Sequence, residues 1–373
     1  MVEDKIKSFV QHIHDVEYVK QQIQSISEIS LRNGPQQGLT TLVNMGNTCY
    51  MNAVIQCLRH STDFNLDRLE GVMLKNLDAN EKLGPGILLF MNYIKLASLM
   101  WQHDKAQLTP ICFRILLAEV APQFANCMQH DAHELLVTLL QLFHDVLSKN
   151  VKYQINGEPM TALDIELSKA HQDWINYYKN RRSIILDTFC GQLRTEMVCL
   201  NCRTPSSKYD PILCLDLPLV PNSDLMTCLS QFVATEQLTP DNLYLCEHCH
   251  IKTCAYKRST LWTLPETLII KLNRFQHRSI GGTYVLEKIV DCVNYPVQGL
   301  NLQLFVSSPL VNQPFYDLQA IVCHAGDLNY GHYYAICRDE ARQTWTRYND
   351  EKCDSIEQPV ISDAYILFYK KRE

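Results

Sequence analysis

Two pairs of cysteines constrain the fold of this chain more than any other feature. Cys199 and Cys202 form one C-x-x-C pair, and Cys246 and Cys249 form the other. A tetrahedral zinc ion binds four thiolates presented two by two in this way. The spacing therefore predicts one structural Zn²⁺ ion with four cysteine ligands and no open position for water. A redox pair or four buried thiols are the alternative interpretations.

The connection between the two pairs is longer than the loop of a compact finger. We expect it to carry Leu215–Ser230 in a two-stranded excursion whose base the metal holds. His248 and His250 are alternative ligands in the second pair, although four cysteines already complete a tetrahedral shell.

The 16 cysteines are expected to be thiols, because nothing in the sequence directs the chain out of the cell. Charged residues occupy Met1–Val10, where a signal peptide needs an apolar stretch, and no apolar run reaches the roughly 20 residues that span a bilayer. A net charge of −6 disfavours non-specific binding to nucleic acid. We expect a cytoplasmic or nuclear protein, or one present in both, with no nucleic-acid or membrane partner.

The 373 residues show helical periodicity first and strand-like runs later. Apolar spacing over Ile6–Ile29 predicts one or two amphipathic helices, which either pack on the protein or bind a partner. Residues 38–150 are predicted to form a helical lobe, and the chain from Ile184 onward is predicted to be β-rich. The expected helices cover Gly86–Trp101, Thr109–Val120 and Asp131–Leu147, and the expected strands include Leu268–Leu272, Leu318–Val322, Tyr333–Ile336 and Tyr365–Phe368.

Cys49 has the surroundings of a reactive cysteine. A turn at Gly46 precedes apolar residues at helical spacing, so Cys49 is expected in the first turn of a helix capped by Thr48 or Asn47. Free N–H groups and the positive end of the helix dipole favour a thiolate there. A lone cysteine of this kind is more often inert, and catalysis also needs a histidine and a group that orients it.

The C-terminal half supplies both groups. His332 opens a strand-like segment at Gly331–Tyr334, and Asn349 and Asp350 follow the next such segment, Thr344–Tyr348. Adjacent antiparallel strands would place Asn349 beside His332.

These motifs resemble those of the ubiquitin-specific proteases, a papain-like family of cysteine deubiquitinases. Asn44–Asn52 (Asn-Met-Gly-Asn-Thr-Cys-Tyr-Met-Asn) is similar to the cysteine box of the family, and Gln129–Leu136 (Gln-His-Asp-Ala-His-Glu-Leu-Leu) is similar to its second signature. Further matches follow in the order of the family: Asn180–Gly191, the paired C-x-x-C motifs, Leu272–Phe275 and Gly331–Tyr334. The resemblance runs from about residue 38 to the C-terminus.

The resemblance implies an α+β, papain-like fold. Residues 38–150 would form a helical thumb and residues 184–373 a β-rich palm, with zinc-bearing fingers inserted at about 195–265. Together they would make up a catalytic domain over 38–373, and residues 1–37 would be a helical extension.

The resemblance also implies a role for each residue of the catalytic centre. Cys49 would be the nucleophile, His332 the general base and Asn349 the residue that orients the imidazole. Many family members have Asp in place of Asn349, and Asp350 would supply the negative charge that an amide lacks. The side chain of Asn44 would donate to the oxyanion together with the Cys49 N–H.

Four further residues are implied in binding the basic C-terminal tail of ubiquitin. Asp131 would be an acidic clamp for that tail, with Glu134 either a second member of the clamp or a solvated helix charge. His324 is expected in a turn before the catalytic histidine that resembles a mobile loop over the tail, and Tyr333 is expected to line the channel for the terminal glycines.

The implied activity is hydrolysis of the isopeptide bond after the C-terminal glycine of ubiquitin through a thioester intermediate. Ubiquitin and ubiquitinated proteins would be the partners, with residues 1–37 as a candidate site for another protein. Two alternatives share the fold: a protease for a different ubiquitin-like modifier, and an inactive scaffold that binds ubiquitin. A zinc-ribbon interaction protein without chemistry would leave the cysteine and histidine motifs unexplained.

Overall fold

The computed structural model describes residues 38–61, 84–102, 106–153, 157, 159–280, 283–312, 314–327, 331–339, 343–359 and 362–372. The helices expected within Ile6–Ile29 lie outside the described residues. The chain divides into two compact units by its internal contacts. Unit 1 comprises residues 1–148, 183–185 and 319–368, and unit 2 comprises residues 149–182, 186–318 and 369–373.

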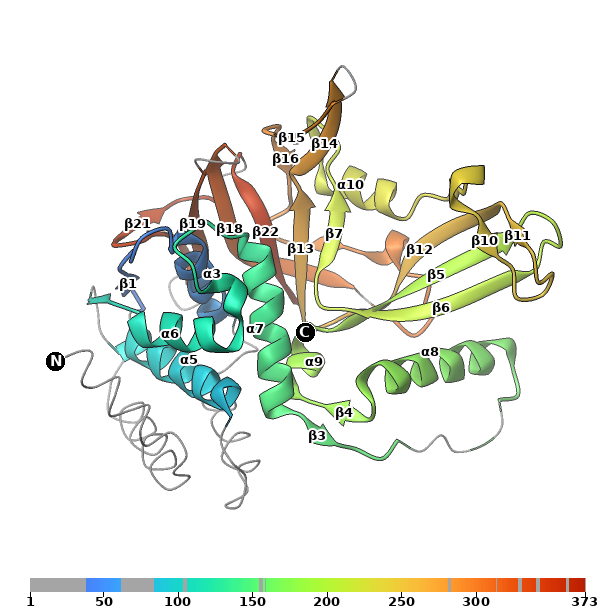
Figure 1. Cartoon of the computed structure of the whole chain (residues 1–373), viewed down its shortest axis with the longest axis horizontal. Coiled ribbons are helices and arrows are strands. Elements are labelled where there is room, and N and C mark those ends of the chain that lie inside the picture. The colour runs from blue at the N-terminus through green and yellow to red at the C-terminus, as the bar shows by residue number, and fades with distance from the viewer. Residues whose placement is uncertain are drawn as a thin grey trace. The chain divides into compact units, whose positions relative to one another are not determined.

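The helices of unit 1 come from the first part of the chain (Figure 1). They are α3 (Cys49–His60), α5 (Pro85–Gln102), α6 (Ile111–Val120) and α7 (Ala132–Leu147), with a 3₁₀ turn, η1, at Pro122–Phe124. Asp131 caps α7 by accepting a hydrogen bond from the His133 N–H at 2.8 Å. The three helices expected between Gly86 and Leu147 are therefore confirmed, with small shifts at their ends.

The strands of unit 1 form an antiparallel sheet in the order β21-β20-β19-β18-β22. Their bounds are β18 (Phe315–Gly326), β19 (Gly331–Asp339), β20 (Thr344–Asn349), β21 (Lys352–Ile356) and β22 (Ala364–Lys371), and the outer ends of β18 and β22 are assigned to unit 2. A separate parallel pair joins β1 (Thr41–Leu42) to β2 (Gln107–Leu108). The strands expected at Leu318–Val322, Tyr333–Ile336 and Tyr365–Phe368 are confirmed.

The packing of α3 on this sheet positions the candidate site. All twelve residues of α3 are buried, and the helix contacts β19 and β20. The Cys337 thiol on β19 donates to the Gln56 carbonyl of α3 at 3.7 Å, and the Tyr348 hydroxyl on β20 donates to the Gly38 carbonyl at 2.8 Å. Burial of apolar side chains on both sides of this contact fixes the start of the helix relative to β19 and β20.

Unit 2 contains a four-stranded antiparallel sheet in the order β6-β5-β12-β9. Its strands are β5 (Gly191–Cys199), β6 (Pro205–Ile212), β9 (Glu236–Gln237) and β12 (Ala255–Thr263). The helix α8 (Ala162–Tyr178) packs on β6 through a cluster of Leu167, Ala170, Tyr209 and Trp262. A capping box between Thr161 and Asp164 begins α8.

The connection between the two cysteine pairs differs from the two-stranded excursion that we expected. Within it, β7 (Leu215–Pro218) pairs in parallel with β13 (Thr267–Asn273), and Leu225–Phe232 forms the helix α10. The prediction for Leu215–Ser230 is wrong because Leu215 and Leu217 are buried in the pairing with β13, while Asp224 caps a new helix. The strand expected at Leu268–Leu272 is confirmed as β13.

The remaining elements of unit 2 are short. They are β3 (Lys149–Asn150), β4 (Arg181–Arg182), β8 (Ser223–Asp224), η2 (Pro240–Asn242), β10 (Tyr244–Leu245), β11 (Lys252–Thr253), β14 (Phe275–Ile280), β15 (Thr283–Lys288), β16 (Val293–Asn294), β17 (Leu300–Asn301) and η3 (Gln303–Phe305), and α9 (Ile184–Phe189) crosses from unit 1 into unit 2. Among the described helices, none has the length and apolar character needed to cross a membrane.

Candidate active site

The loop before α3 holds Cys49 at the start of that helix. Gly46 (φ +92°) and Asn47 (φ +55°) both adopt the left-handed backbone conformation, which glycine and asparagine tolerate. The chain therefore turns sharply there, and Cys49 is the first residue of α3. Its expected position in the first turn is confirmed, and the residue is only 3% exposed.

The polar side chains of this loop bond within the loop and to Cys127. Thr48 occupies the N-cap position, but its hydroxyl donates to Asn44 Oδ1 at 3.2 Å and accepts from the Met45 N–H at 2.9 Å. Asn47 Nδ2 donates to the Cys127 carbonyl at 2.8 Å. Thr48 is therefore the N-cap residue, as expected, but it makes no side-chain capping bond, because its hydroxyl bonds within the loop.

The structure brings Cys49, His332 and Asn349 together. His332 is the second residue of β19 and Asn349 the last of β20, and His332 Nε2 lies 2.6 Å from Asn349 Oδ1. An amide oxygen only accepts, so Nε2 carries the proton of this bond. The Cys49 side chain lies close enough to the His332 ring to act on the pKa of the imidazole.

Interaction with the Cys49 side chain is the main reason why the pKa of His332 is raised to about 9. Partial burial opposes this shift, while Asn349 and the negative charge of Asp350 add to it. The imidazolium form is therefore favoured at neutral pH. A protonated His332 beside a cysteine thiolate is the ion pair from which a cysteine nucleophile acts.

This shift predicts how catalysis depends on pH. Because the pKa of His332 is raised to about 9, the imidazolium is present below that value and is lost as the pH rises through it. For hydrolysis of a ubiquitin C-terminal amide, the activity that the family resemblance implies, we expect kcat/KM to decline on an alkaline limb near pH 9. In Asn349→Ala, one of the interactions that raise the pKa is missing, so the limb moves to lower pH.

The measurement is a pH–rate profile of both proteins beside Asn242→Ala, which alters an exposed asparagine of unit 2. The control should keep the wild-type limb. An Asn349→Ala limb at or above the wild-type position would contradict this account of His332.

Asp350 makes its hydrogen bonds to Asn44 and Asn52, on either side of Cys49, and not to the imidazole of His332. Its Oδ2 lies 3.7 Å from His332 Nε2, beyond hydrogen-bonding distance. Its two carboxylate oxygens accept from Asn52 Nδ2 at 2.8 Å and from Asn44 Nδ2 at 2.9 Å. Asp350 therefore supplies negative charge near the ring while it holds two amides of the loop and of α3.

Asn44 is held in a fixed orientation. Its Oδ1 accepts from the N–H groups of Gly46 and Thr48 at 3.0 and 3.1 Å, in addition to the Thr48 hydroxyl. One of the two Nδ2 hydrogens is donated to Asp350. The same bonds therefore fix the direction of the second N–H.

Asp131 and Glu134 lie at the start of α7. Besides capping the helix, the Asp131 carboxylate accepts from the Tyr365 hydroxyl, which is 2.9 and 2.8 Å from its two oxygens. Tyr365 on β22 thus fixes the direction of this carboxylate. Glu134 is exposed.

His324 and Tyr333 face each other across the β18–β19 hairpin. They are paired in the strand register, and their rings are 4.5 Å apart. His324 is 3% exposed and lies within β18, so its expected position in a turn is wrong: the strand continues to Gly326 before the chain turns. Asp327 follows the strand and is exposed.

Gly331 leaves no room for a side chain. A Cβ at this position would overlap the His324 ring. The Gly331 carbonyl accepts a hydrogen bond from Gln129 Nε2 at 2.9 Å. A side chain of the loop before α7 therefore fixes the position of the residue before His332.

The four cysteines of the paired motifs meet in unit 2. Their Sγ atoms all lie within 4.8 Å of one another, with 3.9 Å between Cys199 and Cys249 and 3.7 Å between Cys202 and Cys246. Four thiolates around a tetrahedral zinc ion are about 3.8 Å apart. The cluster therefore fits this metal.

Both knuckles have the same backbone geometry. Arg203 and His250, which directly follow the second cysteine of each pair, have φ values of +60° and +57°. Their N–H groups donate to the carbonyls of Cys199 and Cys246 at 2.9 and 2.8 Å. His248 and His250 are exposed and lie outside the cluster that the described residues form.

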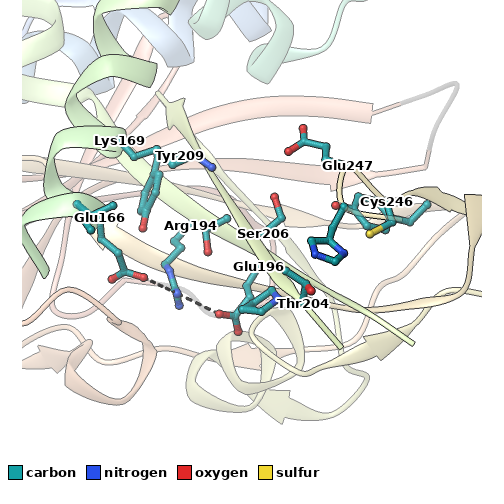
Figure 2. A pocket seen from close by; sticks show the side chains of 14 residues that line it. Glu166, Lys169, Arg194, Glu196, Thr204, Ser206, Tyr209, Cys246 and Glu247 are labelled. Atoms are coloured by element: carbon teal, nitrogen blue, oxygen red, sulfur yellow. Dashed lines mark hydrogen bonds and ion pairs between the residues drawn. The ribbon is translucent and has the colours of Figure 1, made fainter. Parts of the chain in front are cut away.

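A polar pocket lies between α8 and the strands β5 and β6 (Figure 2). Arg194 on β5 donates through one nitrogen to Glu166 of α8 at 2.8 Å and to Glu196 at 3.0 Å. These ion pairs join α8 to the sheet and involve none of the expected site residues, so we assign them a structural role.

The sequence profile of the ubiquitin carboxyl-terminal hydrolase family matches residues 40–369. The chain belongs to this family. Among curated relatives, ubiquitin carboxyl-terminal hydrolase 2 of Bos taurus and that of Homo sapiens are each 30% identical over 342 residues, which cover 90% of this chain and 55% of theirs. Ubiquitin carboxyl-terminal hydrolase 21 of Rattus norvegicus is 29% identical, over 89% of this chain and 61% of its own. The chain thus spans little more than half the length of these hydrolases.

Solved structures of the same fold include two SAGA DUB modules of Ubp8, Sgf11, Sus1 and Sgf73. The module bound to monoubiquitin matches with a TM-score of 0.71 and 25% identity over 94% of this chain and 74% of the other. The module bound to ubiquitin aldehyde matches with a TM-score of 0.69 and 26% identity over 91% and 70%. The expected α+β, papain-like fold of a ubiquitin-specific protease is therefore confirmed.

Three residues of this site were not predicted from the sequence. Asn52 binds Asp350, Tyr365 binds Asp131, and Gln129 binds the Gly331 carbonyl. Asn52 and Gln129 lie inside the two hydrolase motifs, and Asn52 follows Cys49 by one helical turn, which would have placed it on the same face. Nothing local to Tyr365 signals its contact with α7.

Proposed function

We propose that this chain is a cysteine-type deubiquitinase that hydrolyses the isopeptide bond after the C-terminal glycine of ubiquitin. The observation that carries the proposal is the placement of Cys49 beside His332, whose Nε2 is hydrogen-bonded to Asn349. Membership of the ubiquitin carboxyl-terminal hydrolase family supports ubiquitin as the modifier. Curated relatives carry the same activity in their names, and structural neighbours are bound to ubiquitin or ubiquitin aldehyde.

The reaction proceeds by two acyl transfers. The Cys49 thiolate attacks the glycine carbonyl carbon, and the imidazolium of His332 gives its Nδ1 proton to the departing lysine amine as the C–N bond breaks. Water then attacks the thioester, His332 accepts its proton, and the thiolate leaves as the carboxylate of ubiquitin forms. Asn349 keeps the ring oriented through Nε2 in both steps.

We assign stabilisation of the oxyanion in each tetrahedral intermediate to the side-chain amide of Asn44 and the backbone N–H of Cys49. Asp350 and Thr48 hold the Asn44 amide before substrate arrives, so no reorganisation is needed as charge develops. Removal of one such donor in other enzymes costs about 10²–10³ in kcat.

The basic tail of ubiquitin is assigned to the surface beside Asp131. The Tyr365 hydroxyl orients this carboxylate for arginine side chains or backbone N–H groups of the tail, and the exposed Glu134 adds charge. Tyr333 and His324 form the wall next to it.

A single structural zinc ion is assigned to Cys199, Cys202, Cys246 and Cys249. The sulfur spacing and the paired knuckle geometry support a closed tetrahedral site. The ion stabilises the fold of unit 2, since four protein ligands leave no position for a catalytic water.

Two alternative functions predict different results in an activity assay. A protease for another ubiquitin-like modifier has the same catalytic residues, and an inactive scaffold binds ubiquitin without turnover. The intact series of Cys49, His332 and Asn349 argues against the scaffold.

A panel of C-terminal fluorogenic amides of ubiquitin and other ubiquitin-like modifiers separates these alternatives. We expect kcat/KM for ubiquitin to exceed that for each other modifier by at least about tenfold, because a tenfold preference needs only about 1.4 kcal/mol of differential binding. Preference for another modifier would replace the substrate assignment, and tight ubiquitin binding without turnover of any amide would favour the scaffold.

A further inference from the structure

A groove with a volume of about 640 Å³ lies in unit 1 along the outer strands of its sheet. Thr346 of β20 and Ser355 of β21 line it from the sheet, and Thr41 of β1 and Gln107 of β2 line it from the opposite side. Glu351, in the turn between β20 and β21, lies at the groove as well. None of these residues has a role in the catalytic steps derived above.

The groove begins at the catalytic centre. Glu351 directly follows Asp350, and its Oε1 accepts a hydrogen bond from the Asn44 N–H at 2.8 Å. The Glu351 carbonyl accepts from Gln107 Nε2 at 3.3 Å. The turn that contains Glu351 therefore contacts both the loop that contains Asn44 and Gln107 of the groove.

The sheet order places the groove on the side opposite the proposed tail site. In the order β21-β20-β19-β18-β22, His332 is on the central strand β19. Tyr365, which binds Asp131, lies on β22, whereas residues of β20 and β21 line the groove. A substrate whose acyl part occupies the β22 side must direct its leaving group toward the β21 side.

The outer edge of β21 has unused backbone groups. Among the described strands, β21 pairs with β20 alone. The pairing of Asn349 with Lys352 closes a two-residue hairpin, so hydrogen-bonded pairs alternate from there and the N–H and C=O of Ser355 point to the open edge. Within the described part of the chain, Ser355 makes no hydrogen bond, and it is exposed.

We propose that β21 and this groove bind the polypeptide segment that carries the modified lysine, as an extended strand added to the edge of the sheet. This inference rests on the proposed function and concerns the leaving-group side of the same reaction. Main-chain bonds to Ser355 give the segment affinity, and the exposed Glu351 carboxylate favours a basic residue near the lysine. Folded surfaces around a conjugation site, which offer no extended strand, bind this edge less well.

Ser355→Pro tests the proposal, because it removes an outward N–H without removing a bond of the β20–β21 ladder. Two substrates are compared: a ubiquitin fluorogenic amide, which has no polypeptide leaving group, and ubiquitin joined through an isopeptide bond to a lysine in an extended peptide. We expect an unchanged rate on the amide and about a tenfold lower kcat/KM on the peptide conjugate, mostly through KM.

Ser355→Ala is the matched control, since it removes the hydroxyl and keeps the N–H. It should cleave both substrates within about twofold of wild type. Equal rates of Ser355→Pro and wild type on the conjugate would overturn the proposal. An equal loss on both substrates would also overturn it, because the change would then act through the catalytic hairpin. A wild-type protein that cleaves neither substrate would instead overturn the proposed function.

Discussion

Cys49→Ala is expected to lower kcat/KM for a ubiquitin C-terminal fluorogenic amide by about 10⁴-fold or more. The thioester cannot form without the Cys49 sulfur, and His332 then has no nucleophile to activate. Alanine removes little volume from the first turn of α3, so the helix and the loop before it are expected to remain folded. Ubiquitin binding and zinc content should therefore stay close to wild type.

Cys112→Ala provides the control for losing a thiol from the same unit. Burial raises the pKa of the half-buried Cys112 thiol on α6, which keeps it protonated and unreactive. Its removal should leave turnover unchanged. Retained turnover in Cys49→Ala, or an equal loss in Cys112→Ala, would remove Cys49 from the role of nucleophile.

Cys246→Ser is expected to release one zinc ion per chain and to lower the thermal midpoint of unfolding by about 10 °C or more. Serine replaces a soft thiolate with a hydroxyl that binds zinc weakly. Of the four sulfurs that lie within 4.8 Å of one another, only three then remain as ligands. The two knuckles then lose the ion that connects the end of β5 to the segment after β10. Metal analysis and calorimetry on the same samples measure both effects.

Cys292→Ser, an exposed cysteine of the same unit outside the cluster, is the matched control and should keep both the zinc and the thermal midpoint. If Cys246→Ser kept the metal and the wild-type midpoint, the four-cysteine assignment would be wrong. Loss of zinc with an unchanged midpoint would contradict the structural role of the ion.

The proximity of His332 and Asn349 could be predicted from the sequence because two short strand-like segments with a close connection pair as neighbours. The position of Cys49 followed from a glycine turn before an apolar helical pattern. The four cysteines were predictable for a different reason: zinc imposes both the ligand type and the spacing. Each of these predictions depends on local pattern or on fixed coordination chemistry.

The other features of the site and the fold depend on tertiary contacts that the spacing of residues in the sequence does not encode. Asp350 was expected to serve the imidazole, yet its positive φ of +47° in a tight turn directs its carboxylate to Asn44 and Asn52. His324 was expected in a turn, but it lies in β18. The end of a strand is set by its pairing partner, here Tyr333, and local sequence does not show that pairing. α8 was not predicted, since among its residues only Ala170 and Tyr178 are buried and its apolar pattern is weak.

The most direct measurement is to map where a ubiquitin with a C-terminal vinyl sulfone attaches to this chain. The thiolate that attacks the glycine carbonyl in the proposed reaction would add to the vinyl group and form a stable thioether. We predict one ubiquitin per chain, attached to Cys49 in peptide mass spectrometry, with no adduct in Cys49→Ala. An adduct on another of the 16 cysteines, or none on the folded zinc-bound protein, would contradict the assignment of Cys49.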